Sequence, residues 1–551
     1  MALRPHTPHN MKTRLFQPLP LLAIFAAFLV ALPVLAVVLG VFQPDSEAVW
    51  AHLAETVLAG YVANSVALAL GAGLGAALLG VGAAWVVAMH RFPGRGILEW
   101  ALLLPLAMPT YVIAYVYTDL LQFSGPVQTG LRETFDWQRG DYWFPDIRSL
   151  GGAIIVFSLV FYPYVYVLAR TAFLERSGSL MEAAKSLGLS TRRAFFRVAL
   201  PMARPAVVGG VALVVMESLA EFGAVSYFGV PTFTTGIYRA WYAFGSPVAA
   251  AQLAATLLGV VALALLLEKA SRGRARFHET AHRPPILPQL APAPASLAWL
   301  ACLLPLTGGF LLPAALLLNM ASRSGDAQFG EKYLTLALNS FTLALIASVL
   351  VTVLALLLVY AERLHPGRLM AAARRTASLG YAVPGTVIAV GALIPLTALD
   401  HALIAFMRER YGMTLGLLLT GSTIALVFAY IARFLAVAQN AVESSMVRIR
   451  PSIDDAARSL GAGRGALLAR VHLPMLASGL ISAVLLVFVD VMKELPATIV
   501  LRPFNFETLA TQVYILAADE RLAEAATPSL AIVVVGLIPV MLLSRAIRRK
   551  K

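Results

Sequence analysis

Residues 339–360 read NSFTLALIASVLVTVLALLLVY, an apolar run that contains no charged side chain. An α-helix rises 1.5 Å per residue, so about 20 such residues cross the ~30 Å hydrocarbon core of a bilayer. A helix that is apolar on every side must be surrounded by protein or by lipid. The stretch therefore predicts a membrane-spanning helix.

Comparable runs recur along the whole chain, which is 59% hydrophobic and only 13% charged. Soluble domains carry about a quarter charged residues, so this chain lacks the polar surface to fold in water. The single cysteine, Cys302, excludes an intramolecular disulfide and a cysteine metal cluster. We expect an all-α integral membrane protein with about twelve spans, at 17–41, 64–89, 98–121, 150–169, 202–223, 246–267, 297–320, 339–360, 376–398, 414–437, 475–496 and 528–545.

The basic residues predict the orientation of these spans. If the N-terminus is cytoplasmic, most of the 43 lysines and arginines fall in cytoplasmic segments, including Arg548 to Lys551 at the C-terminus. The net charge of +14 therefore reflects topology, and we expect no nucleic acid as a partner. A cleaved signal peptide is the alternative for the first span, but its apolar run from Leu19 to Val41 exceeds the usual 7–15 residues.

The chain contains a direct repeat. Glu182-Ala-Ala-Lys-Ser-Leu-Gly188 returns as Asp455-Ala-Ala-Arg-Ser-Leu-Gly461, a spacing of 273 residues, and Asn64-Ser65 returns as Asn339-Ser340 at a spacing of 275. Six spans in each half make the halves parallel, related by an axis along the membrane normal. We predict a first repeat over 1–267, a cytoplasmic linker rich in proline and arginine over 268–296, and a second repeat over 297–551.

The repeated motif has the form [E/D]-A-A-x3-G-x9-V-x-L-P and falls in predicted cytoplasmic loops at 175–201 and 443–474. Alanine and leucine favour a short helix, and the glycine permits a sharp turn at its end. An acid in the first turn complements the helix dipole. The candidate docking residues are Glu182, Ala183, Ala184, Gly188 and Pro201 in the first copy, and Asp455, Ala456, Ala457, Gly461 and Pro474 in the second.

This motif resembles the EAA motif of ABC importer permeases, whose fold is the type I importer fold. The resemblance implies that each copy docks on an ATPase subunit, so two ATPase copies are expected. The chain has no G-x4-G-K-[ST] phosphate loop, so ATP and magnesium are expected on the partner, with no cofactor bound here. The expected role is a transporter subunit and not an enzyme. The alternative for a single copy is an amphipathic connector that packs on its own bundle.

Two acid pairs follow the same repeat. Glu217 and Glu221 lie in the fifth predicted span, and Asp490 and Glu494 lie in the eleventh, each pair four residues apart on one helix face. Acids at the centre of a bilayer cost about 2.5–3.5 kcal/mol each, so we expect them to face the bundle interior or water. They are candidates for the translocation path and for transient metal contact. The alternative is structural pairing, for instance of Glu494 with Lys493.

Two stretches around these acids resemble ferric-iron permeases. They are EFGAVSYFGVPTFTTGIY at 221–238 and KELPAT at 493–498, and the likeness extends over both halves. It implies a permease of the bacterial inner membrane that receives Fe(III) from a periplasmic binding protein. Carboxylates suit this hard cation. Related members carry thiamine, polyamines or phosphonates, and a less expected alternative is an ion-coupled secondary transporter.

Overall fold

The computed structural model describes residues 18–42, 47–176, 184, 186–271, 288–323, 330–414 and 416–549. In these ranges the regular elements are helices. Eleven are long and apolar enough to cross a membrane, and one bent pair brings the number to twelve if it counts as one span. The predicted all-α, multi-pass membrane fold is confirmed.

Most predicted spans coincide with helices. Two spans of the second half begin nine residues later than predicted, at Gly385 and at Thr423. The first is displaced because Pro384 stops the preceding turn, and the second because Ser422 caps the helix by accepting from the amide of Ile424. The span helices are α2 (Pro18–Gly40), α4 (Leu58–Met89), α8 (Leu150–Arg176), α11 (Leu200–Ala220), α14 (Pro247–Ser271), α15 (Pro292–Leu306) with α16 (Leu312–Arg323), α17 (Glu331–Leu364), α19 (Gly385–Tyr411), α20 (Thr423–Met446), α23 (Leu473–Met492) and α26 (Leu522–Arg549).

The span predicted at 98–121 is wrong as a single straight helix. Residues 95–107 and 110–135 meet at an angle of 92°. Met108 is extended because it precedes Pro109, whose ring excludes the helical conformation of the residue before it. Val383 before Pro384 is extended for the same reason. The broken elements are α5 (Arg95–Ala101), η1 (Leu104–Ala107), α6 (Thr110–Leu121) and α7 (Pro126–Phe135) in the first half, and α18 (Arg368–Ala377) and η5 (Leu379–Ala382) before α19 in the second.

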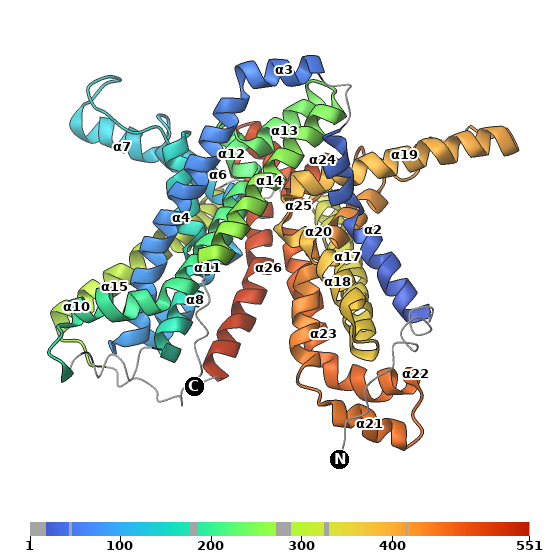
Figure 1. The fold of residues 1–551 in the computed structure, drawn as a ribbon. Coiled ribbons are helices and arrows are strands. Elements are labelled where there is room, and N and C mark those ends of the chain that lie inside the picture. The colour runs from blue at the N-terminus through green and yellow to red at the C-terminus, as the bar shows by residue number, and fades with distance from the viewer. Residues whose placement is uncertain are drawn as a thin grey trace. The chain divides into compact units, whose positions relative to one another are not determined.

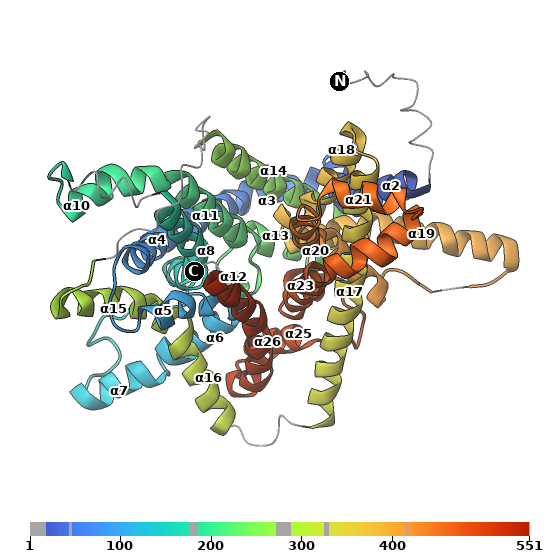
Figure 2. The same cartoon turned by 90° about the horizontal axis from the view of Figure 1, so that it is seen from below.

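The chain forms two compact units. Unit 2 comprises residues 44–336 and 509–551 and is built on α4, α8 and α11, which pack along one another (Figure 1). Their backbones approach closely at glycines, since a Cβ at Gly80 would lie 2.8 Å from the carbonyl oxygen of Tyr162. Helix α26 packs on α16 and on α25 (Leu509–Ala518) (Figure 2). The remaining elements of unit 2 are α3 (Glu47–Thr56), α10 (Thr191–Ala194), η2 (Phe195–Ala199), α12 (Gly223–Tyr227), α13 (Phe233–Tyr242) and η3 (Thr307–Leu311).

Unit 1 comprises residues 1–43 and 337–508. Helix α2 packs against α18 and α19, and a Cβ at Gly391 would lie 2.1 Å from the carbonyl oxygen of Pro33, so glycine permits this contact. Helix α20 packs on α23. The other elements of unit 1 are α21 (Pro451–Ser459), α22 (Arg464–Ala466), η6 (Leu467–His472) and α24 (Pro496–Leu501).

The compact units differ from the sequence repeats at particular helices. Helix α2 belongs to the first repeat but packs within unit 1, whereas α15, α16 and α26 belong to the second repeat and pack within unit 2. Residues 272–287 of the predicted linker lie outside the described residues. The boundaries at 267 and 297 therefore remain a prediction about repeats and are not boundaries of compact units.

Candidate functional site

Both copies of the duplicated motif end in the same backbone geometry. Gly188 and Gly461 have φ values of +79° and +82°, the left-handed region that favours glycine. After each glycine an amide donates a 3.0 Å hydrogen bond to the carbonyl five positions back, a Schellman-type helix end, from Leu189 to Ala184 and from Ala462 to Ala457. The turn expected at each glycine is present, and a β-branched residue would be strained there.

The acids of the motif are described in the second copy only, because Glu182 and Ala183 lie outside the described residues. On α21 the side chain of Asp455 is 75% exposed and lies 3.5 Å from Arg458. Ala456 is exposed beside it, and Ala457 is half-buried. The carboxylate of Asp455 thus faces solvent at the surface of the unit.

The leucine that precedes each motif glycine is also exposed to solvent. Leu187 is 82% exposed and Leu460 is 88% exposed. Isolated surface leucines are ordinary, but equivalent ones in both copies, each beside a tight turn, form a repeated apolar contact point. The sequence carried this signal, because both leucines stand at the same place in the motif.

A buried charged group holds the second copy to its own unit. Asp454 accepts two 2.9 Å hydrogen bonds from the guanidinium of Arg363 and lies 2.9 Å from Nε2 of His472. Arg363 also donates to the carbonyl oxygens of Met446 and Ile449 at 3.1 Å and 3.0 Å. These contacts join α21 to the end of α17 and to the turn before α23. His472 thus has a structural partner, and the sequence analysis identified neither Asp454 nor Arg363 as members of this group.

The electrostatics of this group favour a charged carboxylate. Burial raises the pKa of Asp454, but the hydrogen bonds and charges of Arg363 and His472 outweigh burial and lower this pKa below its usual value. Asp454 is therefore ionised at neutral pH. The α17–α21 contact, defined by Asp454, Arg363 and His472, is a charge-assisted connection.

Each motif leads into a span through one π-helical turn. Element η2 precedes α11 and η6 precedes α23, and each following helix carries a proline in its first turn, Pro201 or Pro474. Proline has no amide hydrogen to donate to the preceding turn, and the wider turn accommodates the missing bond. The prolines thus mark a continuous helical connection between the motif and the fifth and eleventh predicted spans.

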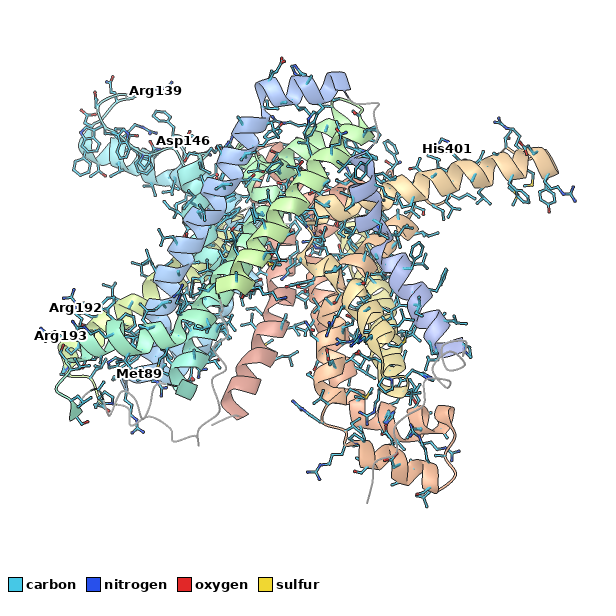
Figure 3. The ribbon with its side chains drawn as sticks, viewed as in Figure 1. Met89, Arg139, Asp146, Arg192, Arg193 and His401 are labelled. Atoms are coloured by element: carbon cyan, nitrogen blue, oxygen red, sulfur yellow. The ribbon has the colours of Figure 1, made fainter. Side chains whose placement is uncertain are left out.

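The labelled side chains of unit 2 lie at two opposite ends. Met89, Arg192 and Arg193 lie at one end, and Arg139 and Asp146 lie at the other (Figure 3). Met89 ends α4, and Arg192 and Arg193 follow the first motif copy. The segments predicted to be cytoplasmic therefore share one end of the unit. In unit 1, α21 and α22 lie at the end opposite α24, while His401 lies on the part of α19 that extends outward (Figures 1 and 3).

The acid at the end of α11 has neutral hydrogen-bond donors. Glu221 accepts from the hydroxyl of Thr110 at 2.8 Å and from the amide of Ala224 at 3.0 Å. Its own carbonyl oxygen accepts from the hydroxyl of Thr234 at 2.7 Å. The side chain is half-buried within unit 2. Glu217 lies one turn earlier on α11 and is also half-buried.

The equivalent acid in unit 1 has a cationic partner. Glu494 is only 4% exposed and lies 3.1 Å from Nη1 of Arg433. It also accepts from the amides of Ala497 and Thr498 and from the hydroxyl of Thr498, at 3.0–3.2 Å. The span predicted to end at 437 continues as α20 to Met446, and this places Arg433 near the middle of the helix.

The pairing suggested for Lys493 is also corrected. Its ammonium lies 3.0 Å from Asp490, one helical turn earlier, and not on Glu494. The four predicted path acids thus divide between the units, Glu217 and Glu221 in unit 2 and Asp490 and Glu494 in unit 1. Among the residues that the structure describes, histidine, cysteine, aspartate and glutamate form no group of three or more that could hold a metal ion.

The sequence of this chain is similar to those of known transport proteins. Residues 76–272 match the family described as binding-protein-dependent transport system inner membrane component. The Fe(3+)-transport system permease protein FbpB 2 of Haemophilus influenzae is 26% identical over 96% of this chain and 98% of its own length. That similarity extends over both repeats.

Two shorter relatives match part of the chain at higher identity. A probable sulfate transport system permease protein of Chlorokybus atmophyticus is 32% identical over 38% of this chain and 70% of its own length. The molybdenum transport system permease protein ModB of Haemophilus influenzae is 30% identical over 37% of this chain and 86% of its own length. The shared property of all three relatives is a permease role in a transport system.

Proposed function

This chain belongs to the family of binding-protein-dependent transport system inner membrane components, and on that premise we propose that it carries ferric iron from the periplasm to the cytoplasm. Similarity to an iron permease over 96% of the chain supports this substrate, whereas the sulfate and molybdenum permeases match over less than half of it. The half-buried acids Glu217 and Glu221 at the end of α11 also favour a cation over an oxyanion.

We place the energy source on a separate ATPase. The two motif copies each present an exposed leucine beside a glycine turn, and Asp455 adds a solvent-facing carboxylate. A short helix of this kind fits a groove on a partner, and two copies are matched by two ATPase subunits. ATP and magnesium belong to those partners, and a periplasmic binding protein supplies the substrate at the other side.

The proposed orientation has both termini in the cytoplasm. The distribution of lysine and arginine supports it. Single cysteines at Ala462 and at Asn505, each in a Cys302→Ala background, should separate in intact cells: an impermeant thiol reagent should label position 505 and not 462. Labelling of 462 alone would reverse the orientation, and labelling of 462 after the cells are opened controls for accessibility.

The substrate is tested in vesicles that contain the permease, its ATPase and its binding protein. Labelled ferric iron should accumulate only when ATP is supplied on the ATPase side. Labelled sulfate and molybdate, presented in the same way, should not accumulate. ATP-dependent uptake of either oxyanion without iron would refute the proposed substrate and leave the permease role intact. Uptake driven by a proton or sodium gradient without ATP would instead support a secondary transporter.

A further inference from the structure

Helix α19 has two parts with different surroundings. Residues 385–393 are buried and pack on α2, α20 and α24 within unit 1. Beyond Asp400 the helix leaves these neighbours, and in both views it runs sideways, across the direction of α20 and α23 (Figures 1 and 2). The outer arm, defined as residues 399–414 and the returning residues 416–420, lies at the end of unit 1 opposite α21 and α22 (Figure 1).

The outer arm is an ordered hairpin. Gly412 follows the last residue of α19 with a φ of +66°, the left-handed region that favours glycine, and its amide donates a 3.1 Å hydrogen bond to the carbonyl of Arg408. The buried carboxylate of Asp400 holds the returning residues. It accepts hydrogen bonds from three consecutive amides at 418–420, at 2.8–3.1 Å, and from the hydroxyl of Thr420 at 2.6 Å. These contacts fix the shape of the arm within unit 1.

The helical part of the arm is amphipathic. Successive residues of an α-helix are rotated by about 100°. Leu399, Leu403 and Met407 therefore share one face, because they stand four residues apart, and Phe406 lies on the same side. Leu399 and Phe406 are each more than half exposed. Arg408 is two residues beyond Phe406, so it lies on the opposite side of the helix, and it is exposed as well.

Exposed apolar side chains continue on the returning segment. Met413 and Leu417 are more than half exposed. A cluster of exposed apolar side chains in one short hairpin marks a site of interaction with a partner or with a membrane. At the tip of the arm, Tyr411 and Arg410 combine an apolar body with a polar or charged end, which is typical of side chains at the surface of a bilayer.

Unit 2 has a counterpart of the helical part of the arm. Helix α7, residues 126–135, is equivalent to residues 401–410 at the repeat spacing of 275, and in both views it projects away from α4 and α8 (Figures 1 and 2). Val127, Leu131 and Phe135 stand four residues apart on one face of α7, and Phe135 is more than half exposed. In the loop that follows, Trp143 is 86% exposed. Each half thus carries an amphipathic helix that leaves its unit sideways.

A bilayer surface fits these features better than a protein partner does. A helix that lies in the plane of a membrane places its apolar face against the acyl chains and its polar face toward headgroups and water. The sideways direction and the two faces of the arm meet both requirements. A binding protein that delivers substrate must contact the permease where its spans gather, whereas the arm leads away from α20 and α23.

We propose that the outer arm is an interfacial anchor, which lies along the headgroup region of one leaflet with Phe406 toward the acyl chains and Arg408 toward headgroups and water. The leaflet is the outer one in the proposed orientation of the chain. The anchor does not depend on the iron substrate. It implies that α19 contributes to the crossing of the membrane only as far as Asp400.

The test measures the depth of two side chains on opposite faces of the arm. Phe406→Cys and Arg408→Cys, each in the Cys302→Ala background, are labelled with an environment-sensitive fluorophore. Normal elution from gel filtration establishes that both variants are folded. The labelled permease is placed in vesicles of phosphatidylethanolamine and phosphatidylglycerol that contain lipids brominated either near the headgroup or near the end of the acyl chain, with iodide added on both sides.

The label at position 406 should lose most of its fluorescence to lipids brominated near the headgroup and little to those brominated near the chain end. The reason is that an interfacial helix buries its apolar face only about 5–10 Å deep. The label at position 408 should be quenched by iodide and little by bromine.

Three results would overturn the anchor. Strong quenching of both labels by bromine at the chain end would show a helix that crosses the bilayer. Quenching of position 406 by iodide alone would place the arm in water. Protection of position 406 from iodide only when the binding protein is added would make the arm a docking surface. The measurement requires no transport, so an error in the proposed substrate would leave its outcome unchanged.

Discussion

Replacement of Glu99 by arginine is expected to remove most of the folded permease from the membrane. Glu99 on α5 pairs with Arg170 on α8, and both side chains are nearly fully buried. Tyr166 adds a 2.9 Å hydrogen bond to the carbonyl of Glu99. Breaking a buried ion pair by changing one partner costs about 3–5 kcal/mol, because the other charge stays buried without compensation. Folded protein extracted after expression, measured by fluorescence-detected gel filtration, should fall sharply.

The second half contains the same connection with its charges reversed. Arg374 on α18 lies 2.8 Å from Glu443 on α20, at the positions equivalent to Glu99 and Arg170, and it also pairs with Glu362. The residue of the short helix that forms this pair is thus acidic in the first half and basic in the second. If α5 packed on α20, Glu99 would meet Glu443, and the repulsion would oppose exchange between homologous helices.

This charge reversal makes the prediction specific. The double variant Glu99→Arg with Arg170→Glu copies the polarity of the second half and should recover much of the folded protein lost in either single variant. Arg139→Glu, a charge reversal at an exposed position, serves as the control and should have little effect. Equal loss in the double and single variants would show that the pair contributes through its shape and not through its charge.

Replacement of Asp454 by asparagine is expected to weaken both ATPase binding at the second docking motif and ATP-driven transport. Asparagine leaves Arg363 without its anionic partner and removes the charge beside His472. Loss of this buried connection costs about 3–5 kcal/mol. Because these contacts hold α21 to α17 and to the turn before α23, the helix should lose its fixed position. We expect ATPase co-purification and ATP-driven uptake to fall together.

The neighbouring acid provides the matched control. Asp455 is exposed and pairs with Arg458, one helical turn away, so Asp455→Asn should leave the fold intact and affect the contact with the ATPase alone. Membrane abundance measured on both variants distinguishes lost folding from lost coupling. Normal ATPase binding and normal uptake in Asp454→Asn would contradict the role of the buried group.

The pH dependence of the α17–α21 contact follows from the same residues. The pKa of Asp454 is lowered in the folded protein, so its stabilisation is present above the unfolded value, about 3.9, and is lost as pH falls through the lower folded value. Arg363 and His472 are the titratable groups that contact it. ATPase binding should therefore be insensitive to Asp454 ionisation through the neutral range.

The three residues of the buried charged group belong to the second half of the sequence and are replaced in the first. At the repeat-equivalent positions of Asp454, His472 and Arg363 the first half has Met181, Ala199 and His90. The first copy therefore lacks the residues of the buried charged group. The sequence already contained this difference, but it became interpretable only when the three side chains were found together, because they are separated by up to 109 positions along the chain.

Local chemistry was sufficient to predict much of this protein. The lengths of the apolar runs predicted the spans, because a helix that crosses a bilayer needs about 20 consecutive apolar residues. The glycines at 188 and 461 predicted turns, because the left-handed conformation is a property of one residue. The spacing of the repeat was enough to pair Glu221 with Glu494. The break at Pro109 was also encoded locally, but a continuous apolar run concealed it.

Tertiary structure alone decided which charges meet and which helices share a unit. Glu494 was matched with Lys493 by proximity in sequence, yet it pairs with Arg433 on another helix, and Lys493 pairs with Asp490. Helix α2 belongs to the first repeat by order and packs with helices of the second. The sequence alone shows which segments cross the membrane and which repeat each belongs to, because apolar runs and repeated motifs are properties of residue order. Ion-pair partners depend on the approach of distant helices, because a buried charge takes whichever opposite charge the packing brings within 4 Å.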